Sequence, residues 1–255
     1  SFVGKAHFSS KITFKATGTP ECKKSASNYP EDWVGPYMGF NHVELAALGK
    51  FHRARLPDDA PVIHRFEHAL LSHPNALDLW QSSSTPGSGA AQTWASCLPA
   101  EWHSSAWVAD RTLAILEKQK DASQPFFTWA SFPDPHHPFD CPAPWNSMYK
   151  PSDMELPKHR TLDLEKRPWW HRAALEGSPQ IADPELAKFR SEGFKVPPQT
   201  DQQLREMTAN YYGMISLVDH HIGRILDGLK QSGLADNTLI VFASDHGDML
   251  GDHGL

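Results

Sequence analysis

The sequence is poor in cysteine, and its three cysteines are scattered. Cys22, Cys97 and Cys141 form neither a CxxC metal knuckle nor an even-numbered disulfide framework. The Asn-x-Ser/Thr acceptor of N-glycosylation is also missing, which disfavours a glycosylated secretory enzyme. These absences argue against a disulfide-stapled fold and against a cysteine-ligated zinc module.

Long apolar runs and an excess of one charge are missing as well. No apolar run reaches the roughly 18 to 20 residues that cross a bilayer as a helix. The 24 Lys and Arg against 30 Asp and Glu give a net charge of −6, so nothing points to a nucleic-acid partner. The chain shows no initiator Met and no basic, apolar leader. We expect both ends to be cut, which leaves the localisation unknown.

The residues that are present suit one large globular domain. The chain has 255 residues, of which 40% are hydrophobic, enough to bury a sizeable core. Apolar runs at 126–132 and 238–243 predict buried strands, and residues 1–8 resemble the end of a strand followed by a polar loop. The stretches 9–100 and 141–200 are interpreted mainly as loops, with short helices in the first.

Two helices are predicted between these strands. Residues 101–120 have helical spacing of apolar positions and lysines in the last turn. A second, longer helix begins at a capping box formed by Thr200 and Gln203 and stops at Gly233. Strands that alternate with helices indicate an α/β fold with a largely parallel central sheet flanked by helices. Ligands of such sheets bind beyond the carboxyl ends of the strands.

The last of three polar motifs follows the predicted strand 238–243. Asp245 offers a hard oxygen and His246 an imidazole nitrogen, and both suit a divalent cation if Gly247 lets the backbone turn sharply. Asp-His-Gly also serves as a plain turn. Asp252 and His253, set among glycines seven residues later, favour a loop that wraps an ion or ligand, but we do not count them as ligands.

The middle motif, residues 134–139, follows the strand 126–132. Prolines on both sides of His136 and His137 fix the loop and hold an imidazole in place. Such a group can donate a proton to a leaving group or hold an anionic oxygen. One of two adjacent histidines is often merely solvated, so a catalytic role and a structural one are both open.

The first motif is Gly-Lys-x-His at residues 4–7. Lys5 and His7 share one face if the segment is extended, and together they suit an anionic group. Lys-x-His is common by chance and is weak evidence alone. No nucleophile is visible beside these residues.

The three motifs together resemble those of the sulfatase family in the alkaline phosphatase-like superfamily, above all arylsulfatases and phosphonate monoester hydrolases. The resemblance rests on Gly-Lys-x-His, on Pro-His-His-Pro-Phe after a Pro-Phe-Phe strand, and on Asp-Asn-Thr-Leu-Ile-Val-Phe followed by Ser-Asp-His-Gly-Asp-Met-Leu-Gly-Asp-His-Gly. It is densest over residues 101–150 and 204–255. It implies an alkaline phosphatase-like fold, of which residues 1–255 form a single incomplete catalytic domain.

The resemblance also implies roles for single residues. Asp245 and His246 match two ligands of one divalent ion, usually calcium and sometimes manganese. Lys5 matches a lysine that binds the anionic oxygens of the ester. His7 matches a histidine placed against the nucleophile, and His136 matches the histidine that contacts the scissile group.

Two parts of the family pattern are not in this chain. The nucleophile of the family is a formylglycine made from a Cys/Ser-x-Pro-x-Arg motif upstream of Gly-Lys-x-His, and acidic metal ligands also lie near the family's N-terminus. Cys97-Leu98-Pro99 mimics the start of that motif but lacks the arginine and follows Lys5, so a structural cysteine is the better interpretation. Asp219-His220-His221 repeats an Asp-His pair inside the long helix, where neighbours face different directions and cannot chelate one ion.

The expected function is metal-dependent hydrolysis of small-molecule or saccharide sulfate esters through a formylglycine outside this chain, which by itself is expected to be inactive. A phosphonate monoester or phosphodiester hydrolase on the same scaffold is the first alternative, because a nitrogen ligand at His246 tolerates softer metals. A non-catalytic relative that keeps the metal loop is the second.

Overall fold

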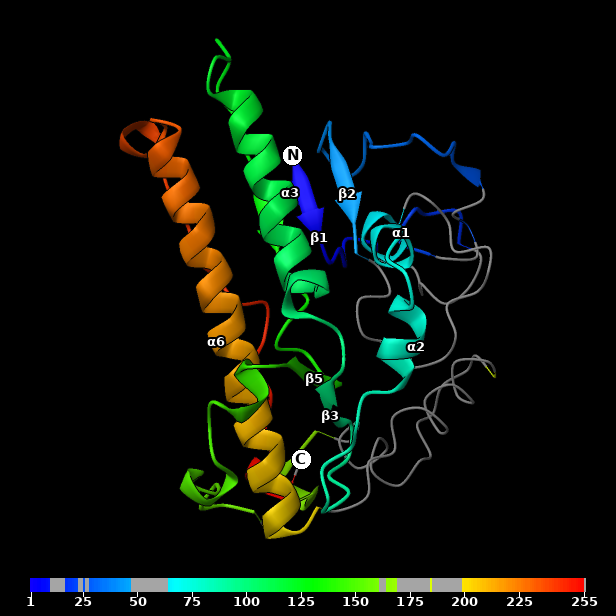
Figure 1. Cartoon of the computed structure of the whole chain (residues 1–255), viewed down its shortest axis with the longest axis vertical. Coiled ribbons are helices and arrows are strands. Elements are labelled where there is room, and N and C mark those ends of the chain that lie inside the picture. The colour runs from blue at the N-terminus through cyan, green and yellow to red at the C-terminus, as the bar shows by residue number, and fades with distance from the viewer. Residues whose placement is uncertain are drawn as a thin grey trace.

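The computed structural model describes residues 1–9, 17–22, 25, 28–46, 64–160, 164–168, 184 and 199–254. Figure 1 shows two long helices standing side by side in front of short strands, with two shorter helices beside them. The strands are β1 (Phe2–Gly4), β2 (Val43–Leu45), β3 (Thr93–Ser96), β4 (Trp129–Ser131) and β5 (Phe139–Pro142). The α-helices are α1 (Arg65–Leu71), α2 (Ala76–Gln81), α3 (Ser104–Gln119) and α6 (Asp201–Gln231). Short 3-10 turns lie at Ala100–Trp102, Trp145–Ser147, Pro151–Asp153, Leu164–Lys166, Ala235–Asn237 and Asp252–Gly254.

The main sheet is parallel, as the alternation of strands and helices predicts. Its order is β2-β1-β4, with Phe2 opposite Val43 on one side and opposite Trp129 on the other. The predicted strands at 1–8 and 126–132 are therefore confirmed as β1 and β4, although each spans only three residues. All three strands end at the same edge of the sheet, where the polar motifs after β1 and β4 begin.

A second parallel pair, β3 with β5, was missed by the sequence patterns, as was β2. These strands are three or four residues long and lie within stretches interpreted as loops. Their pairing depends on partners far along the chain, such as Phe139 opposite Thr93. A run this short carries too little periodicity to be told from a loop.

Both predicted helices are confirmed. The first is α3, and the 3-10 turn Ala100–Trp102 precedes it. The second is α6, where the Thr200 hydroxyl accepts from the Gln203 amide and the Gln203 side chain accepts from the Thr200 amide, the expected capping box. The predicted stop, Gly233, adopts a φ of +70° just after the helix, a conformation that glycine adopts without steric cost.

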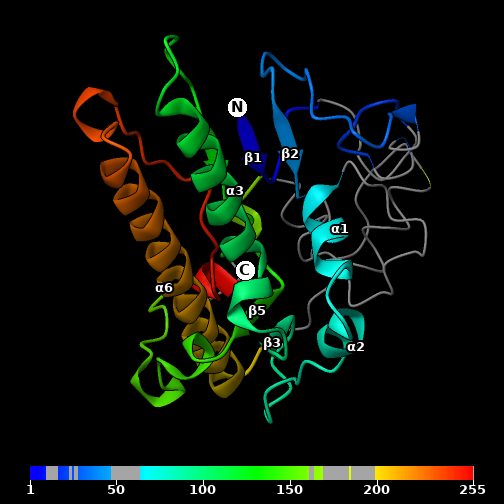
Figure 2. The ribbon, with the colours of Figure 1, turned by 45° about the horizontal axis from the view of Figure 1, so that its top comes forward.

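The two long helices pack over different strands. Val108 and Ile115 on α3 contact Val3 of β1 in one apolar cluster. Met207 and Met214 on α6 contact Phe139 of β5 in another. Figure 2, turned from the first view, shows α3 and α6 still alongside each other on the same side of the molecule. Because α3 packs on the strands β1 and β4 and α6 on β5, the single loop between β4 and β5 joins the two packed units.

The prediction of a strand at residues 238–243 is wrong. Within the part of the chain that the structure describes, this segment forms no ladder with any strand, and it follows the 3-10 turn Ala235–Asn237 as extended chain. Its apolar side chains are exposed, Leu239 by 90%, Val241 by 77% and Phe242 by 79%. A β-strand needs neighbours for its amides and carbonyls, and apolarity alone does not provide them.

The Asp219-His220-His221 pair lies on α6, as expected, with the first two side chains exposed and His221 buried. His221 Nδ1 lies 3.1 Å from Arg224 of the same helix. None of the helices in the described segments combines the length and apolar character that a bilayer crossing requires.

Candidate active site at the sheet edge

Lys5 follows the carboxyl end of β1, and hydrogen bonds hold its backbone in place. Its amide donates to the carbonyl of Ser131 at 3.1 Å, and the Ser131 hydroxyl donates to the carbonyl of Lys5 at 2.7 Å. The preceding Gly4 has a φ of +116°, and a Cβ at that position would lie 1.9 Å from the Ser131 carbonyl oxygen. Only glycine therefore allows β1 and β4 to approach this closely beside the lysine.

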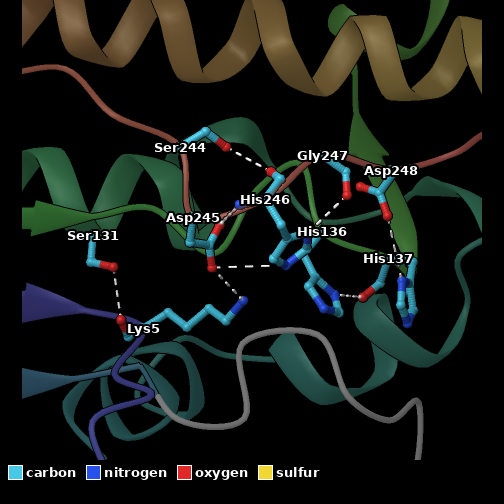
Figure 3. Close-up of polar contacts among 9 residues, drawn as sticks. All are labelled: Lys5, Ser131, His136, His137, Ser244, Asp245, His246, Gly247 and Asp248. Carbon is cyan, nitrogen blue, oxygen red and sulfur yellow. Dashed lines mark hydrogen bonds and ion pairs between the residues drawn. The ribbon is translucent and has the colours of Figure 1, made fainter. Parts of the chain in front are cut away.

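The ammonium of Lys5 points at the last motif (Figure 3). Lys5 Nζ lies 3.8 Å from Oδ2 of Asp245, and the lysine side chain is only 14% exposed. Burial lowers the pKa of Lys5, while the carboxylates of Asp245 and Asp248 act in the opposite direction. A cation held in place by carboxylates, with little water around it, is suited to binding an anionic oxygen.

Asp245 and His246 form a compact turn beside that ammonium. The amide of His246 donates to Oδ1 of Asp245 at 3.0 Å, and the hydroxyl of Ser244 donates to the carbonyl of His246 at 2.7 Å. Nδ1 of His246 lies 2.9 Å from the carbonyl of Gly247, which can only accept, so this nitrogen carries the proton. Nε2 is thereby directed to Asp245, 3.8 Å from Oδ2.

These two donors fit one divalent cation. Oδ2 of Asp245 and Nε2 of His246 lie 3.8 Å apart, and both side chains are at least half exposed. A carboxylate oxygen and an unprotonated imidazole nitrogen at this separation can contact the same ion. Burial tends to raise the pKa of Asp245, but the Lys5 ammonium and the hydrogen bond from the His246 amide act against burial, and the pKa is lowered, which keeps the carboxylate ionised. Among the described residues, no cluster of three or more His, Cys, Asp or Glu side chains is arranged to hold a metal ion.

The loop after β4 brings the two adjacent histidines to the same place. The ring of His136 lies 5.6 Å from that of His246, edge to face, and Nδ1 of His136 donates to the carbonyl of His137 at 2.5 Å. Burial lowers the pKa of His136 to about 4, although the hydrogen bond to the His137 carbonyl acts in the opposite direction. His137 turns to the other side, with Nδ1 3.9 Å from Oδ1 of Asp248 (Figure 3).

His7 lies close enough to this group to interact with it electrostatically. Burial and the charge of Lys5 lower its pKa, although its side chain remains accessible. The chain after it is anchored by Glu21, whose Oε1 accepts from the amides of Phe8 and Ser9, each at 3.0 Å. Neither Glu21 nor Asp248 was singled out from the sequence. Asp248 had a signal, since it stands within the Asp-His-Gly-Asp run, whereas Glu21 lies in a stretch without pattern.

The structure thus brings together the residues predicted from three separate motifs: Lys5, His7, His136, Asp245 and His246. Two other candidates lie in different surroundings. Cys97 follows β3, and its thiol donates to the Ser82 carbonyl at 3.4 Å. The ring of His253 lies against that of His159, with centroids 4.2 Å apart and the planes tilted by 40°.

Comparison with known proteins shows which family the chain is similar to. A family model described as Sulfatase matches residues 34–255. A multifunctional alkaline phosphatase superfamily protein of Trinickia caryophylli is 32% identical over 197 residues, which cover 71% of this chain and 34% of that protein. An arylsulfatase of Clostridium perfringens is 33% identical over 151 residues, which cover 59% of this chain and 28% of that protein. The chain therefore spans about a third of the length of these curated relatives.

A solved structure shows the same fold. The phosphonate monoester hydrolase of Silicibacter pomeroyi superimposes with a TM-score of 0.58 at 25% sequence identity, over 91% of this chain and 45% of that one. The parallel sheet flanked by helices is thus the predicted alkaline phosphatase-like α/β fold. With a family model that covers most of its length, the chain belongs to the sulfatase family.

Proposed function

We propose that the full-length protein hydrolyses sulfate esters of small molecules or saccharides. The observation that carries this proposal is the convergence of Lys5, His136 and the Asp245–His246 pair from three separate segments onto one edge of the sheet. This edge carries a cation, a half-buried imidazole and two side chains of the types that bind metal ions. Hydrolysis of an anionic ester needs such groups for charge neutralisation and proton transfer. Membership of the sulfatase family supports the substrate class.

Each residue has a distinct part in this proposal. Asp245 and His246 would hold one divalent cation, calcium or manganese, which supplies Lewis-acid stabilisation of the ester oxygens when bound. Lys5 binds the same non-bridging oxygens and neutralises their charge. Its low exposure strengthens that interaction, since little water competes for the ammonium.

The two histidines are assigned to proton transfer. Because Nδ1 of His136 donates to the His137 carbonyl, Nε2 is the nitrogen that exchanges a proton with the leaving alcohol. A pKa of about 4 keeps His136 neutral at neutral pH, so the anionic ester has to favour its protonated form. His7 is assigned to the nucleophile, which in this family is a formylglycine encoded upstream of Gly-Lys-x-His.

The catalytic unit is proposed to extend beyond residues 1–255. The nucleophile motif that the family resemblance implies does not occur in this chain, and Asp245 and His246 would supply only two of the ligands that a divalent cation needs. Residues 1–255 therefore make up one incomplete catalytic domain, and we expect no turnover from this chain alone.

A phosphonate monoester or phosphodiester hydrolase is the second candidate. A nitrogen ligand at His246 favours it, because imidazole tolerates softer metals than an all-oxygen shell does. The superposition on the phosphonate monoester hydrolase of Silicibacter pomeroyi supports the same alternative. Sulfate and phosphonate esters both present anionic oxygens to Lys5 and the metal pair, so relative turnover of the two substrates decides between them.

The test is hydrolysis of an aryl sulfate and an aryl phosphonate by the full-length protein, with and without a chelator. Removing the metal and substituting Asp245→Ala should each reduce kcat/KM for the preferred ester by at least about 100-fold, since both remove electrostatic stabilisation of the transition state. Asp219→Ala on α6 is the matched control, because it removes an exposed aspartate from the other Asp-His pair.

Each outcome is distinct. Turnover of the sulfate that depends on metal and on Asp245 supports the sulfatase proposal. Turnover of the phosphonate alone transfers the function to the second candidate. Activity that is indifferent to the chelator and to Asp245→Ala contradicts the metal assignment.

A further inference from the structure

Beneath the loop that carries His136 lies a buried polar cluster to which the proposed mechanism gives no role. Its members are His103, Ser105, Asp134 and Asp140, and none is more than 6% exposed. They come from the start of α3, from the loop of residues 133–138 (called the His136 loop below) and from β5. Buried polar groups are retained at a cost in desolvation, so such a cluster calls for a reason.

The cluster ties both ends of the His136 loop to one helix. At the first end, Asp134 Oδ2 accepts a hydrogen bond from the hydroxyl of Ser105 and lies 3.3 Å from Nδ1 of His103. Just past the other end, Nε2 of His103 lies 3.1 Å from the carbonyl oxygen of Asp140. One imidazole therefore contacts the chain on both sides of His136.

The positions of the protons on His103 determine which partners its two ring nitrogens can have. The Asp140 carbonyl can only accept, so Nε2 of His103 carries a proton. Nδ1 lies 3.3 Å from Oδ2 of Asp134, which is within ion-pair distance but lacks hydrogen-bond geometry, so the contact is electrostatic and is attractive when the imidazole carries both protons. An amide in place of the Asp134 carboxylate would lose this attraction.

Because Asp134 and His136 belong to the same tight turn, fixing Asp134 also restricts the position of His136. Asp134 precedes His136 by two residues, and the amide of His136 donates to the carbonyl of Pro133 at 3.2 Å, which closes a turn around Asp134. The start of α3 that holds Asp134 is in turn packed on β1, through Val108 against Val3. Lys5 directly follows that same strand. One helix therefore fixes the position of the His136 loop relative to the lysine.

We propose that Asp134, held by His103 and Ser105, is a positioning residue that sets the place of the His136 imidazole relative to Lys5 and the metal pair. This inference rests on the proposed function, in which His136 exchanges a proton with the leaving group. Asp134 touches neither substrate nor metal in this scheme. Its effect is exerted through the loop.

The experiment compares Asp134→Asn and Ser105→Ala with wild type in the full-length protein. Thr112→Val is the matched control, since Thr112 carries a buried hydroxyl on the same helix that donates its hydrogen bond to the Val108 carbonyl and not to the loop. The first readout is kcat and KM for aryl esters whose leaving groups range from good to poor, using the ester class that the wild type cleaves. The second is NMR of histidine side chains labelled with ¹⁵N, with the His136 signals identified from their loss in His136→Gln.

We expect both cluster variants to lower kcat for the poorest leaving group by about tenfold or more, with little change for the best one and little change in KM. Misplacement of a proton donor by a fraction of an ångström has effects of this size, and they grow as the leaving group needs more help. Thr112→Val should leave that ratio unchanged. The His136 ring signals should shift in both cluster variants and not in the control.

Two results would overturn the proposal. Equal loss of kcat for all leaving groups, in proportion to the loss of folded protein, would show a purely structural cluster. Unchanged His136 signals in the two cluster variants would do the same, even for a protein without turnover. If the wild type cleaves no ester while the signals do shift, the proposed function fails and the positioning role stands.

Discussion

At the scale of single residues, the site depends on a glycine that does no chemistry. Gly4 lets β1 pass beside the Ser131 carbonyl, and Lys5 follows at once with its backbone held on both sides by Ser131. The position of the lysine is therefore determined by the close approach of two strands.

Gly4→Ala should destabilise the full-length protein by about 3 kcal/mol, because it combines a clash with backbone and an unfavourable positive φ. Gly18→Ala is the matched control. Gly18 also has a positive φ, of +78°, but a Cβ there would meet nothing within 4 Å. It should cost only about 1 kcal/mol. Denaturant unfolding measures both, and equal costs would contradict the role assigned to the contact with Ser131.

At the scale of elements, β2 and α3 are joined by a buried carboxylate. Glu44 accepts from Nε of Arg111 at 2.6 Å and from its Nη2 at 2.9 Å, and lies 2.9 Å from Nε2 of His42. Burial by itself raises the pKa of Glu44. The hydrogen bonds from His42 and Arg111 outweigh burial and lower the pKa to about 2.

This shift predicts a pH dependence of stability. A carboxyl group whose pKa is lower in the folded state stabilises the protein above its unfolded pKa of 4.5, and the contribution is lost as pH falls from there toward about 2. Because Arg111 is partly exposed, the contribution is put at about 2 kcal/mol. Urea unfolding of wild type and Glu44→Gln at pH 6, about 4 and about 3 tests it. The two free energies of unfolding should converge as the pH falls, and a constant gap would argue against the linkage.

At the scale of elements, local sequence patterns were sufficient to predict where the helix α6 begins and ends. The capping box of Thr200 and Gln203 and the stop at Gly233 correctly bounded α6, because caps are decided by local hydrogen bonds. The strands β2, β3 and β5 were not found, because each exists only through pairing with a distant segment.

At the scale of the whole molecule, the exposed segment 238–243 stands out. It is rich in β-branched and apolar residues, carries no charge and lies unpaired among the described residues. Exposed segments of this kind pair with other chains. The segment also leads directly into the turn of Asp245 and His246.

Residues 1–255 expressed alone should therefore self-associate through this segment. Val241→Lys should shift the light-scattering mass toward the monomer, because a charge on an exposed strand opposes edge pairing. Leu226→Lys is the control, since Leu226 is 39% exposed but lies on α6. Equal effects of the two substitutions would contradict the assignment to 238–243.

Local pattern by itself determined the two long helices, the strand cores at β1 and β4, and the identity of the residues that meet at the site. Helix spacing, caps and metal-ligand residue types are written in neighbouring positions, so they can be read without a partner. Only the tertiary structure decided which segments pair, that residues 238–243 do not, and that Asp134 and Glu21 anchor the segments bearing His136 and His7. Those outcomes depend on contacts between residues far apart in the chain, and such contacts leave no local pattern.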